Sequence, residues 1–230
     1  MPVAIITGAS KGFGRAVATD LAADGWKVVI DGRHRGPLFD VAAALDGSGG
    51  TVIPVAGDVI DAAHRAAVVA MAESLGGVDL LVHNASELGP SPLPPLRRFP
   101  VDVLRHVYEV NVIAPLALFQ LALTGLRASR GTVVSVSSDA AVEAYPGWGG
   151  YGSSKSALDQ LHHVLAVEEP DLRVYQFDPG DMRTDMHQAA FPGDDISDRP
   201  EPESVVPALR QLLESGTPSG RYRAAEWVAA

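Results

Sequence analysis

The chain has 230 residues, 47% of them hydrophobic and 20% charged, a balance typical of a folded globular core rather than of a disordered chain. The formal net charge of −10 disfavours nucleic acid and anionic membranes as partners. The absence of cysteine excludes disulfides, thiolate metal sites and cysteine nucleophiles.

The length suits one domain of the α/β class, so we expect residues 1–230 to form a single domain. The N-terminus has no basic region, and its apolar run is too short for a secretory signal. No run of consecutive apolar residues approaches the length of about 20 that a membrane span needs. We therefore expect a cytoplasmic protein with no membrane partner.

Short runs rich in β-branched residues alternate with longer helical patterns along the chain. The predicted strands are 3–6, 27–30, 51–55, 79–83, 132–136 and 173–177, with a weaker one near 221–225. The predicted helices are 14–24, 38–45, 62–75, 101–126 and 152–168. This alternation predicts a doubly wound, Rossmann-like parallel sheet with helices on both faces. Two long loops, 87–100 and 180–202, are expected to be functional or mobile.

A glycine-rich turn follows the first predicted strand and opens the first predicted helix. It reads Thr7-Gly8-Ala9-Ser10-Lys11-Gly12-Phe13-Gly14. Glycine permits a tight turn and a close approach of the backbone, and a helix N-terminus attracts phosphate. Strand, glycines and helix together predict the pyrophosphate site of a dinucleotide.

Tyr151 and Lys155 are four residues apart on a predicted helix, so their side chains lie on one face. A cation beside a phenol favours the phenolate and lowers the pKa of the tyrosine, which suits a proton donor or acceptor. Such a pair is also common on solvated helix surfaces, so the rest of the chain must decide its meaning.

With its Gly-x-x-x-Gly-x-Gly turn and Tyr-x-x-x-Lys pair, the chain resembles the short-chain dehydrogenase/reductase family in its short, single-domain form. Further matches follow in the family's order: Asp58-Val59, Asn84-Ala85, Asn111, Ser137-Ser138 and Pro179-Gly180 with Thr184. Ser86 departs from the family pattern, which has a glycine after the Asn-Ala pair. From the residue alone, Asp58 also fits an ordinary helix N-cap.

The resemblance implies a nicotinamide dinucleotide as cofactor. The residues it implies as cofactor contacts are Gly8, Ser10, Lys11, Gly12, Phe13, Gly14, Arg33, Asp58, Val59, Asn84, Ala85, Tyr151, Lys155, Pro179, Gly180 and Thr184. No metal is expected, because no histidine pair has metal-ligand spacing: His162 and His163 are adjacent and face different directions.

The resemblance also implies a catalytic tetrad of Asn111, Ser138, Tyr151 and Lys155. Ser138 would donate a hydrogen bond to the carbonyl oxygen, and Tyr151 would supply the proton. Lys155 would hold the ribose hydroxyls and lower the pKa of Tyr151, while Asn111 would hold a water that leads to solvent. Asparagine is unfavourable in a helix interior, so Asn111 indicates either an exposed helix face or a local kink where its side chain has a hydrogen-bonding task.

The residues after the second predicted strand bear on the choice of cofactor. An acidic residue there binds the ribose hydroxyls of NAD, whereas an arginine favours the 2′-phosphate of NADP. By the family's register the deciding position is Gly32, followed by Arg33, and Lys11 adds a second cation. We expect NADP(H) rather than NAD(H), although a shift of one residue would return Asp31 to the deciding position.

The resemblance implies a reversible reductase that acts on a small-molecule ketone or aldehyde. The alternatives are an epimerase or dehydratase that retains NADP(H), and a dinucleotide sensor without redox activity. The resemblance also implies a homodimer or homotetramer, because relatives pair the long apolar helices that correspond to 101–126 and 152–168 across a two-fold axis. His187 lies in the second long loop, where we expect it at the loop surface, with a place in the substrate pocket as the alternative. Trp148 is expected in the pocket wall.

Overall fold

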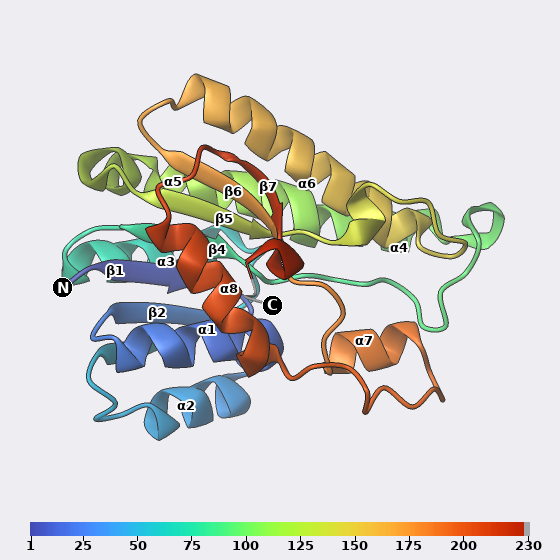
Figure 1. The fold of residues 1–230 in the computed structure, drawn as a ribbon, viewed down its shortest axis with the longest axis horizontal. Coiled ribbons are helices and arrows are strands. Elements are labelled where there is room, and N and C mark those ends of the chain that lie inside the picture. Colours follow the sequence, from blue (N-terminus) through green and yellow to red (C-terminus); the bar gives the residue numbers. More distant parts are fainter. Residues whose placement is uncertain (228–230) are drawn as a thin grey trace.

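The computed structural model describes residues 1–227, and its centre is a parallel sheet of seven strands (Figure 1). The strands are β1 (Val3–Ile6), β2 (Lys27–Gly32), β3 (Thr51–Ala56), β4 (Leu80–His83), β5 (Thr132–Val136), β6 (Arg173–Asp178) and β7 (Gly220–Arg223). Their order in the sheet is β3-β2-β1-β4-β5-β6-β7, and every pair is parallel. The doubly wound α/β fold is confirmed, including the weaker last strand.

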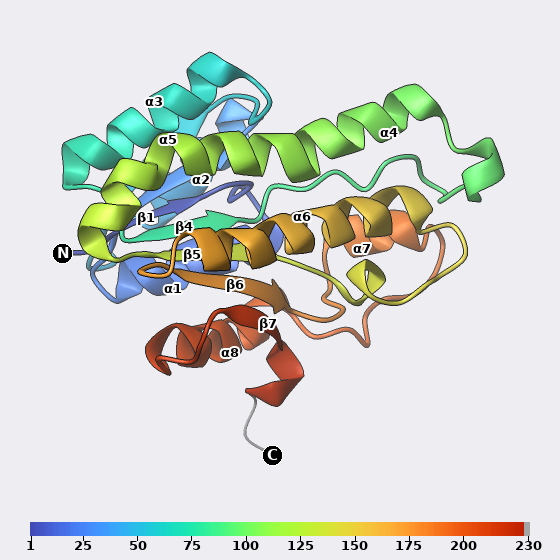
Figure 2. The ribbon, with the colours of Figure 1, turned by 90° about the horizontal axis from the view of Figure 1, so that it is seen from above.

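Helices cover both faces of this sheet (Figures 1 and 2). One face carries α1 (Gly12–Ala23), α2 (Arg35–Ala44) and α8 (Pro202–Glu214). The other carries α3 (Ala62–Leu75), α4 (Val101–Tyr108), α5 (Ala114–Ser129) and α6 (Gly149–Glu168). A short helix, α7 (Asp185–Ala190), projects beyond the strand ends.

The sheet separates two apolar core layers, and β1 contributes side chains to both of them. All four of its residues are buried: Ala4 and Ile6 face the α1 and α8 layer, whereas Val3 and Ile5 face the α3 and α5 layer. Side chains of a strand point alternately to opposite faces, so a strand covered on both sides must be apolar throughout. This explains why the predicted strands are continuous apolar runs.

The predicted helix 101–126 is interrupted by a π-helical turn at Glu109–Ile113, which separates α4 from α5. By length and composition alone, the combined stretch Val101–Ser129 is long and apolar enough to cross a membrane, contrary to our expectation from the sequence. In this fold 56% of its most apolar window is buried, as expected for a helix that covers a sheet.

Two helices were not predicted. The short α7 interrupts the expected loop 180–202, and α8 begins where that loop ends, at Pro202. Two prolines hide α8 in the sequence: Pro202 occupies its first turn, where a missing N–H is harmless, and Pro207 lies inside it. The available sequence signal for this helix was the helical spacing of the apolar residues Val205, Leu209 and Leu212, all of which are buried in the structure.

Candidate active site

The carboxyl ends of the strands and the loops that follow them enclose a cleft of about 980 Å³. The cleft includes the point where β1 and β4 are neighbours and the chain winds in opposite directions on either side, which is where such sheets bind ligands. Every predicted cofactor contact except Gly14 lines the cleft, as does every predicted catalytic residue except Asn111.

The glycine-rich turn forms a cradle that only glycine allows. Gly8 and Gly12 have φ angles of +66° and +57°, in the left-handed region. A Cβ atom on Gly14 would lie 2.4 Å from Nδ2 of Asn84. That amide nitrogen donates hydrogen bonds to the carbonyl oxygens of Thr7 (2.9 Å) and Gly8 (3.0 Å). Asn84 therefore braces the turn from the neighbouring strand.

The cradle fits a dinucleotide pyrophosphate. Lys11, at the N-cap of α1, makes no capping bond with its side chain, and the first turn of α1 contains no acidic residue. Its first backbone N–H groups and the positive end of the helix therefore face the cleft, as a bound phosphate needs. Gly12 leaves the approach open, because the only atom near a Cβ there would be a methyl of Thr184, at 3.6 Å.

Asp31 has a structural task beneath the turn. Its carboxylate is buried, with Oδ1 accepting from the backbone N–H of Gly8 at 3.0 Å and Oδ2 lying 2.6 Å from Nε2 of His64. Asp31 and the two residues that follow it, Gly32 and Arg33, all line the cleft. Both oxygens of the Asp31 carboxylate thus have partners inside the protein, and the next side chain along the chain that lines the cleft is the cation Arg33.

Two cations border the cleft, and each pairs with an acid from the opposite side. Nζ of Lys11 lies 2.7 Å from Oδ2 of Asp185 on α7, and Nη1 of Arg33 lies 3.8 Å from Oε2 of Glu87. The side chains of Lys11 and Arg33 are more than half exposed, so solvent screens both pairs. An arriving anion can compete for either cation.

Asp58 and Val59 line the cleft after β3, as expected. Asp58 is not the N-cap of α3. Its Oδ1 accepts from the N–H of Ile60 in a local turn, at 3.1 Å, while Asp61 caps the helix by accepting from the N–H of Ala63, at 2.8 Å. The alternative reading of Asp58 as an ordinary cap is therefore wrong.

Tyr151 and Lys155 lie on one face of α6, and both are buried. Nζ of Lys155 lies 5.5 Å from the centre of the Tyr151 ring and donates a hydrogen bond to the carbonyl oxygen of Val136 at 2.8 Å. Ser138 follows β5, and its hydroxyl donates to Oδ1 of Asp139 at 3.0 Å. The three side chains reach the same end of the cleft from two neighbouring elements.

Asn111 lies in the π-helical turn and is buried beside this group. Its Nδ2 donates to Oγ of Ser154 and to the carbonyl oxygen of Glu87, both at 2.9 Å. Its Oδ1 accepts from the N–H of Glu87 at 2.7 Å and from Oγ of Ser86 at 3.3 Å. Of the two expectations for Asn111, the kink with a hydrogen-bonding task is confirmed, and the asparagine ties the loop after β4 to α6.

Lys155 does not lower the pKa of the Tyr151 phenol in this structure, contrary to our expectation. Burial raises the pKa of the Tyr151 phenol, and hydrogen bonding by the hydroxyls of Ser86 and Ser138 opposes that rise. Burial also lowers the pKa of Lys155, to about 8, and the opposing effect of the nearby Asp159 is included in that value. The lysine points to Val136 rather than to the phenol, so Tyr151 keeps its proton and can act as an acid.

The segment after β6 borders the cleft where we expect the nicotinamide to bind. Gly180 has a φ angle of +73°, and its N–H donates to Oδ1 of Asp178 at 3.0 Å. Thr184 caps α7 by accepting from the N–H of His187 at 3.2 Å. Pro179, Gly180 and Thr184 all line the cleft, where the sequence places them.

Aromatic rings line the substrate side of the cleft. Trp148 meets Tyr151 edge to face, with ring centres 5.8 Å apart, and lies 5.9 Å from Phe191. The His187 side chain is nine-tenths buried and its ring lies 4.9 Å from that of Phe191, tilted by 44°. The expected surface position is therefore wrong, and His187 lines the cleft instead. Phe191 was missed because it follows α7, which the sequence did not indicate.

The two adjacent histidines face different directions as expected, since His162 is buried and His163 is exposed. Across residues 1–227, no group of three or more histidine, aspartate or glutamate side chains is arranged to hold a metal ion.

Comparisons with known proteins agree with this geometry. A model of the short chain dehydrogenase family matches residues 2–195. Sepiapterin reductase from Mus musculus is 32% identical, over 94% of this chain and 87% of its own length.

Two solved structures extend the likeness to the whole fold. A short chain dehydrogenase from Shigella flexneri complexed with NADP is 28% identical, with a TM-score of 0.88 and 97% of each chain covered. An alcohol dehydrogenase from the archaeon Thermococcus sibiricus complexed with 5-hydroxy-NADP is also 28% identical, with a TM-score of 0.86 and 97% of this chain and 95% of that chain covered. The chain belongs to the short-chain dehydrogenase family of nicotinamide-dependent oxidoreductases, which act on CH–OH and C=O groups.

Proposed function

We propose that this protein is an NADP(H)-dependent reductase of a small-molecule ketone or aldehyde, reversible as an alcohol dehydrogenase. The observation that carries the proposal is the convergence of Ser138, Tyr151 and Lys155 at one end of the cleft that contains the glycine cradle. A carbonyl in this position meets a hydrogen-bond donor and an acid together.

Bound NADPH would supply the hydride that adds to the carbonyl carbon. As the C=O bond becomes a single bond, negative charge develops on its oxygen, and the Ser138 hydroxyl stabilises it by donating a hydrogen bond. Tyr151, which burial keeps protonated, transfers its proton to that oxygen and completes the alcohol. The Lys155 ammonium, whose Nζ lies 5.5 Å from the Tyr151 ring centre, stabilises the resulting phenolate and would hold the ribose hydroxyls of a bound cofactor. Asn111 holds the loop after β4 against α6 beside this group.

Three features favour NADP(H) over NAD(H). The Asp31 carboxylate is occupied by Gly8 and His64 and is not available to bind ribose hydroxyls. Arg33 and Lys11 line the cleft and offer two cations to a 2′-phosphate. The Shigella and Thermococcus relatives bind NADP and a derivative of it.

The substrate is a carbonyl compound with an apolar or aromatic body. Trp148, Phe191 and Leu88 supply an apolar wall beside Tyr151. The names of two relatives, a sepiapterin reductase and an alcohol dehydrogenase, fit the same reaction at a carbonyl or alcohol group.

We also propose a cytoplasmic homodimer or homotetramer, without nucleic acid or membrane partners. Exposed apolar side chains on the outer surfaces of the π-helical turn, α5 and α6 support the oligomer; they are Ile113, Leu116, Leu121, Val164 and Val167. Light scattering that finds only monomers at micromolar concentration would contradict it.

The decisive test replaces Tyr151 with Phe. We expect Tyr151→Phe to fold and to bind NADPH, and to lose carbonyl reduction by about 10²–10⁴-fold, the usual contribution of a general acid. Absorbance of NADPH would be followed across a panel of ketones and aldehydes. Turnover close to that of the wild type in Tyr151→Phe would refute the mechanism. Tight NADPH binding without oxidation by wild type across the panel would favour an epimerase, a dehydratase or a sensor.

A further inference from the structure

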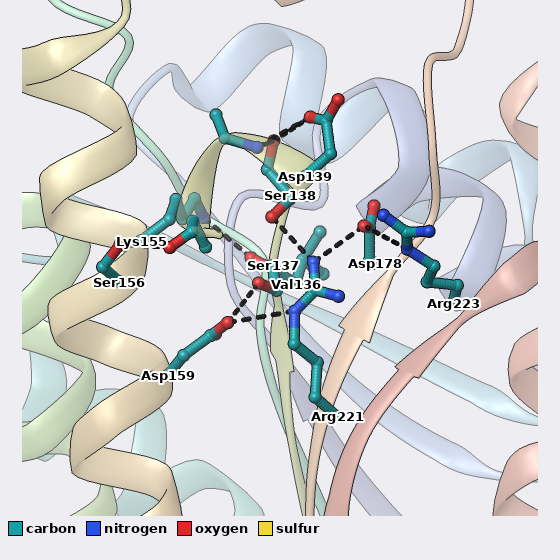
Figure 3. Close-up of polar contacts among 12 residues, drawn as sticks. Val136, Ser137, Ser138, Asp139, Lys155, Ser156, Asp159, Asp178, Arg221 and Arg223 are labelled. Carbon is teal, nitrogen blue, oxygen red and sulfur yellow. Dashed lines mark hydrogen bonds and ion pairs between the residues drawn. The ribbon is translucent and has the colours of Figure 1, made fainter. Parts of the chain in front are cut away.

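A partly buried arginine, Arg221, lies next to Ser138, the catalytic serine of the proposed function (Figure 3). Arg221 belongs to β7, the last strand, and its side chain is 17% exposed. Its Nη2 donates hydrogen bonds to the carbonyl oxygen of Ser138 and to Oδ2 of Asp178, both at 2.8 Å. Its Nε lies 3.4 Å from Oδ2 of Asp159. One guanidinium thus contacts three segments of the active site.

These contacts hold residues 137 and 138 from two sides. Oγ of Ser137 donates to Oδ2 of Asp159 at 2.7 Å, and the backbone of Ser138 accepts from Arg221. Asp159 lies one helical turn after Lys155 on α6. The Asp159–Arg221 pair therefore connects the helix that carries Lys155 to the strand end that carries Ser138.

The same guanidinium also contacts the segment after β6, at Asp178. Asp178 ends β6, and its second carboxylate oxygen accepts from the N–H of Gly180. Asp159 and Asp178 are both buried, so two carboxylates share the charge of Arg221. A buried carboxylate without a counter-ion is strongly destabilising, which explains why an arginine stands at the centre.

We propose that Arg221 is a positioning residue that fixes the Ser138 backbone relative to Lys155 and to the Asp178–Gly180 segment. Its planar guanidinium binds several oxygens at once in fixed directions, which a lysine ammonium on a flexible chain does not do. Ser138 needs such a support because its segment leaves the sheet at this point and is bounded by a short 3-10 turn, Asp139–Ala141. The inference rests on the proposed function only in that Ser138 is its catalytic hydrogen-bond donor.

The test compares Arg221→Lys with the wild type and with a matched control, Arg223→Lys. Arg223 lies two residues further along the same strand, with Nε 3.9 Å from Oδ2 of the same Asp178, but its side chain is half exposed and it makes no contact with Ser138. We expect Arg221→Lys to bind NADPH and to lose about 10- to 100-fold in kcat, the scale of loss for a reacting group displaced by about 1 Å. We expect Arg223→Lys to keep the kcat of the wild type.

A double-mutant cycle shows whether Arg221 acts through the serine. If it does, Arg221→Lys reduces kcat much less in a Ser138→Ala background than in the wild type, because the group being positioned is already absent. An equal fold-loss in both backgrounds, or a wild-type kcat in Arg221→Lys, would overturn the proposal.

A structural comparison makes the proposal independent of turnover. In crystals of the NADPH complexes, we expect Oγ of Ser138 to move relative to the Tyr151 hydroxyl in Arg221→Lys and to stay in place in Arg223→Lys. An unmoved Ser138 in Arg221→Lys would overturn the inference even if the protein reduces no carbonyl tested. Absence of reduction by the wild type would instead count against the proposed function.

Discussion

The two ends of the cleft are built in different ways. The cofactor end is fixed by hydrogen bonds between partly buried groups, such as those of Asp31 and Asn84 to the glycine turn. The substrate end is lined by aromatic rings around Phe191, a residue that is itself 36% exposed. Loops on a rigid scaffold can change without loss of the fold, so this chain keeps its chemistry fixed at one end and its selectivity adjustable at the other.

The largest effect is expected at the cofactor end, from Gly14→Ala. The new methyl would lie 2.4 Å from Nδ2 of Asn84 and 2.8 Å from the carbonyl oxygen of Gly8, so it displaces the brace of the turn. We expect the free energy of unfolding to fall by about 1–3 kcal/mol, as for other overpacked sites, and NADPH binding to be lost. Urea unfolding and fluorescence titration with NADPH measure the two effects.

Gly36→Ala is the matched control for this substitution. Gly36 lies in α2, and nothing lies within 4 Å of its added Cβ. We expect unchanged NADPH binding and a gain of up to about 1 kcal/mol, because alanine favours the helix more than glycine does. If both variants bind NADPH like the wild type, the cofactor end is less rigid than its contacts indicate.

A smaller effect is expected from Arg33→Asp, which reverses one charge at the adenosine end. Charge-assisted hydrogen bonds contribute about 1.5–3 kcal/mol, so we expect a loss of about 10- to 100-fold in NADPH affinity and little change for NADH. Titration with both cofactors measures the difference. An unchanged preference for NADPH would show that Arg33 does not meet the 2′-phosphate.

The smallest effect is expected at the substrate end, from Phe191→Ala. The ring contacts His187 and Trp148 but not the catalytic residues, so its loss should raise the KM for a bulky carbonyl a few-fold and leave kcat unchanged. Phe39→Ala on α2 is the control, since Phe39 lies outside the cleft lining. A fall in kcat at constant KM would place Phe191 in the reaction itself and would weaken the contrast between the two ends.

Much of the fold could be predicted because buried parallel strands leave an unmistakable apolar pattern. The N-terminal strand and glycine turn are local features, and local features are readable from sequence. The π-helical turn and α8 were missed for opposite reasons. The turn has no residue signature beyond a polar Asn111 in an apolar helix, and the prolines of α8 conceal a real amphipathic pattern.

The candidate site also has one part that could be predicted from the sequence and one part that could not. Residues that follow strands could be placed from the sequence, because parallel strands end at one edge of the sheet. Contacts between distant segments could not: nothing near Arg221 indicates that it reaches Ser138, which is 83 positions earlier in the chain. The burial that raises the pKa of Tyr151 is likewise a property of the packed molecule and not of the Tyr-x-x-x-Lys pattern.

The π-helical turn at Glu109–Ile113 makes this chain sensitive to length rather than to composition. Each residue of an α-helix turns the chain by about 100°, so deleting one residue here would restore a regular helix and rotate all of α4 relative to α5. Asn111 would swing away from Glu87 and Ser154, although every other side chain is retained. A one-residue deletion in this turn should therefore be far more damaging than most substitutions within it. Natural variants of this segment should differ in residue identity while keeping the same length.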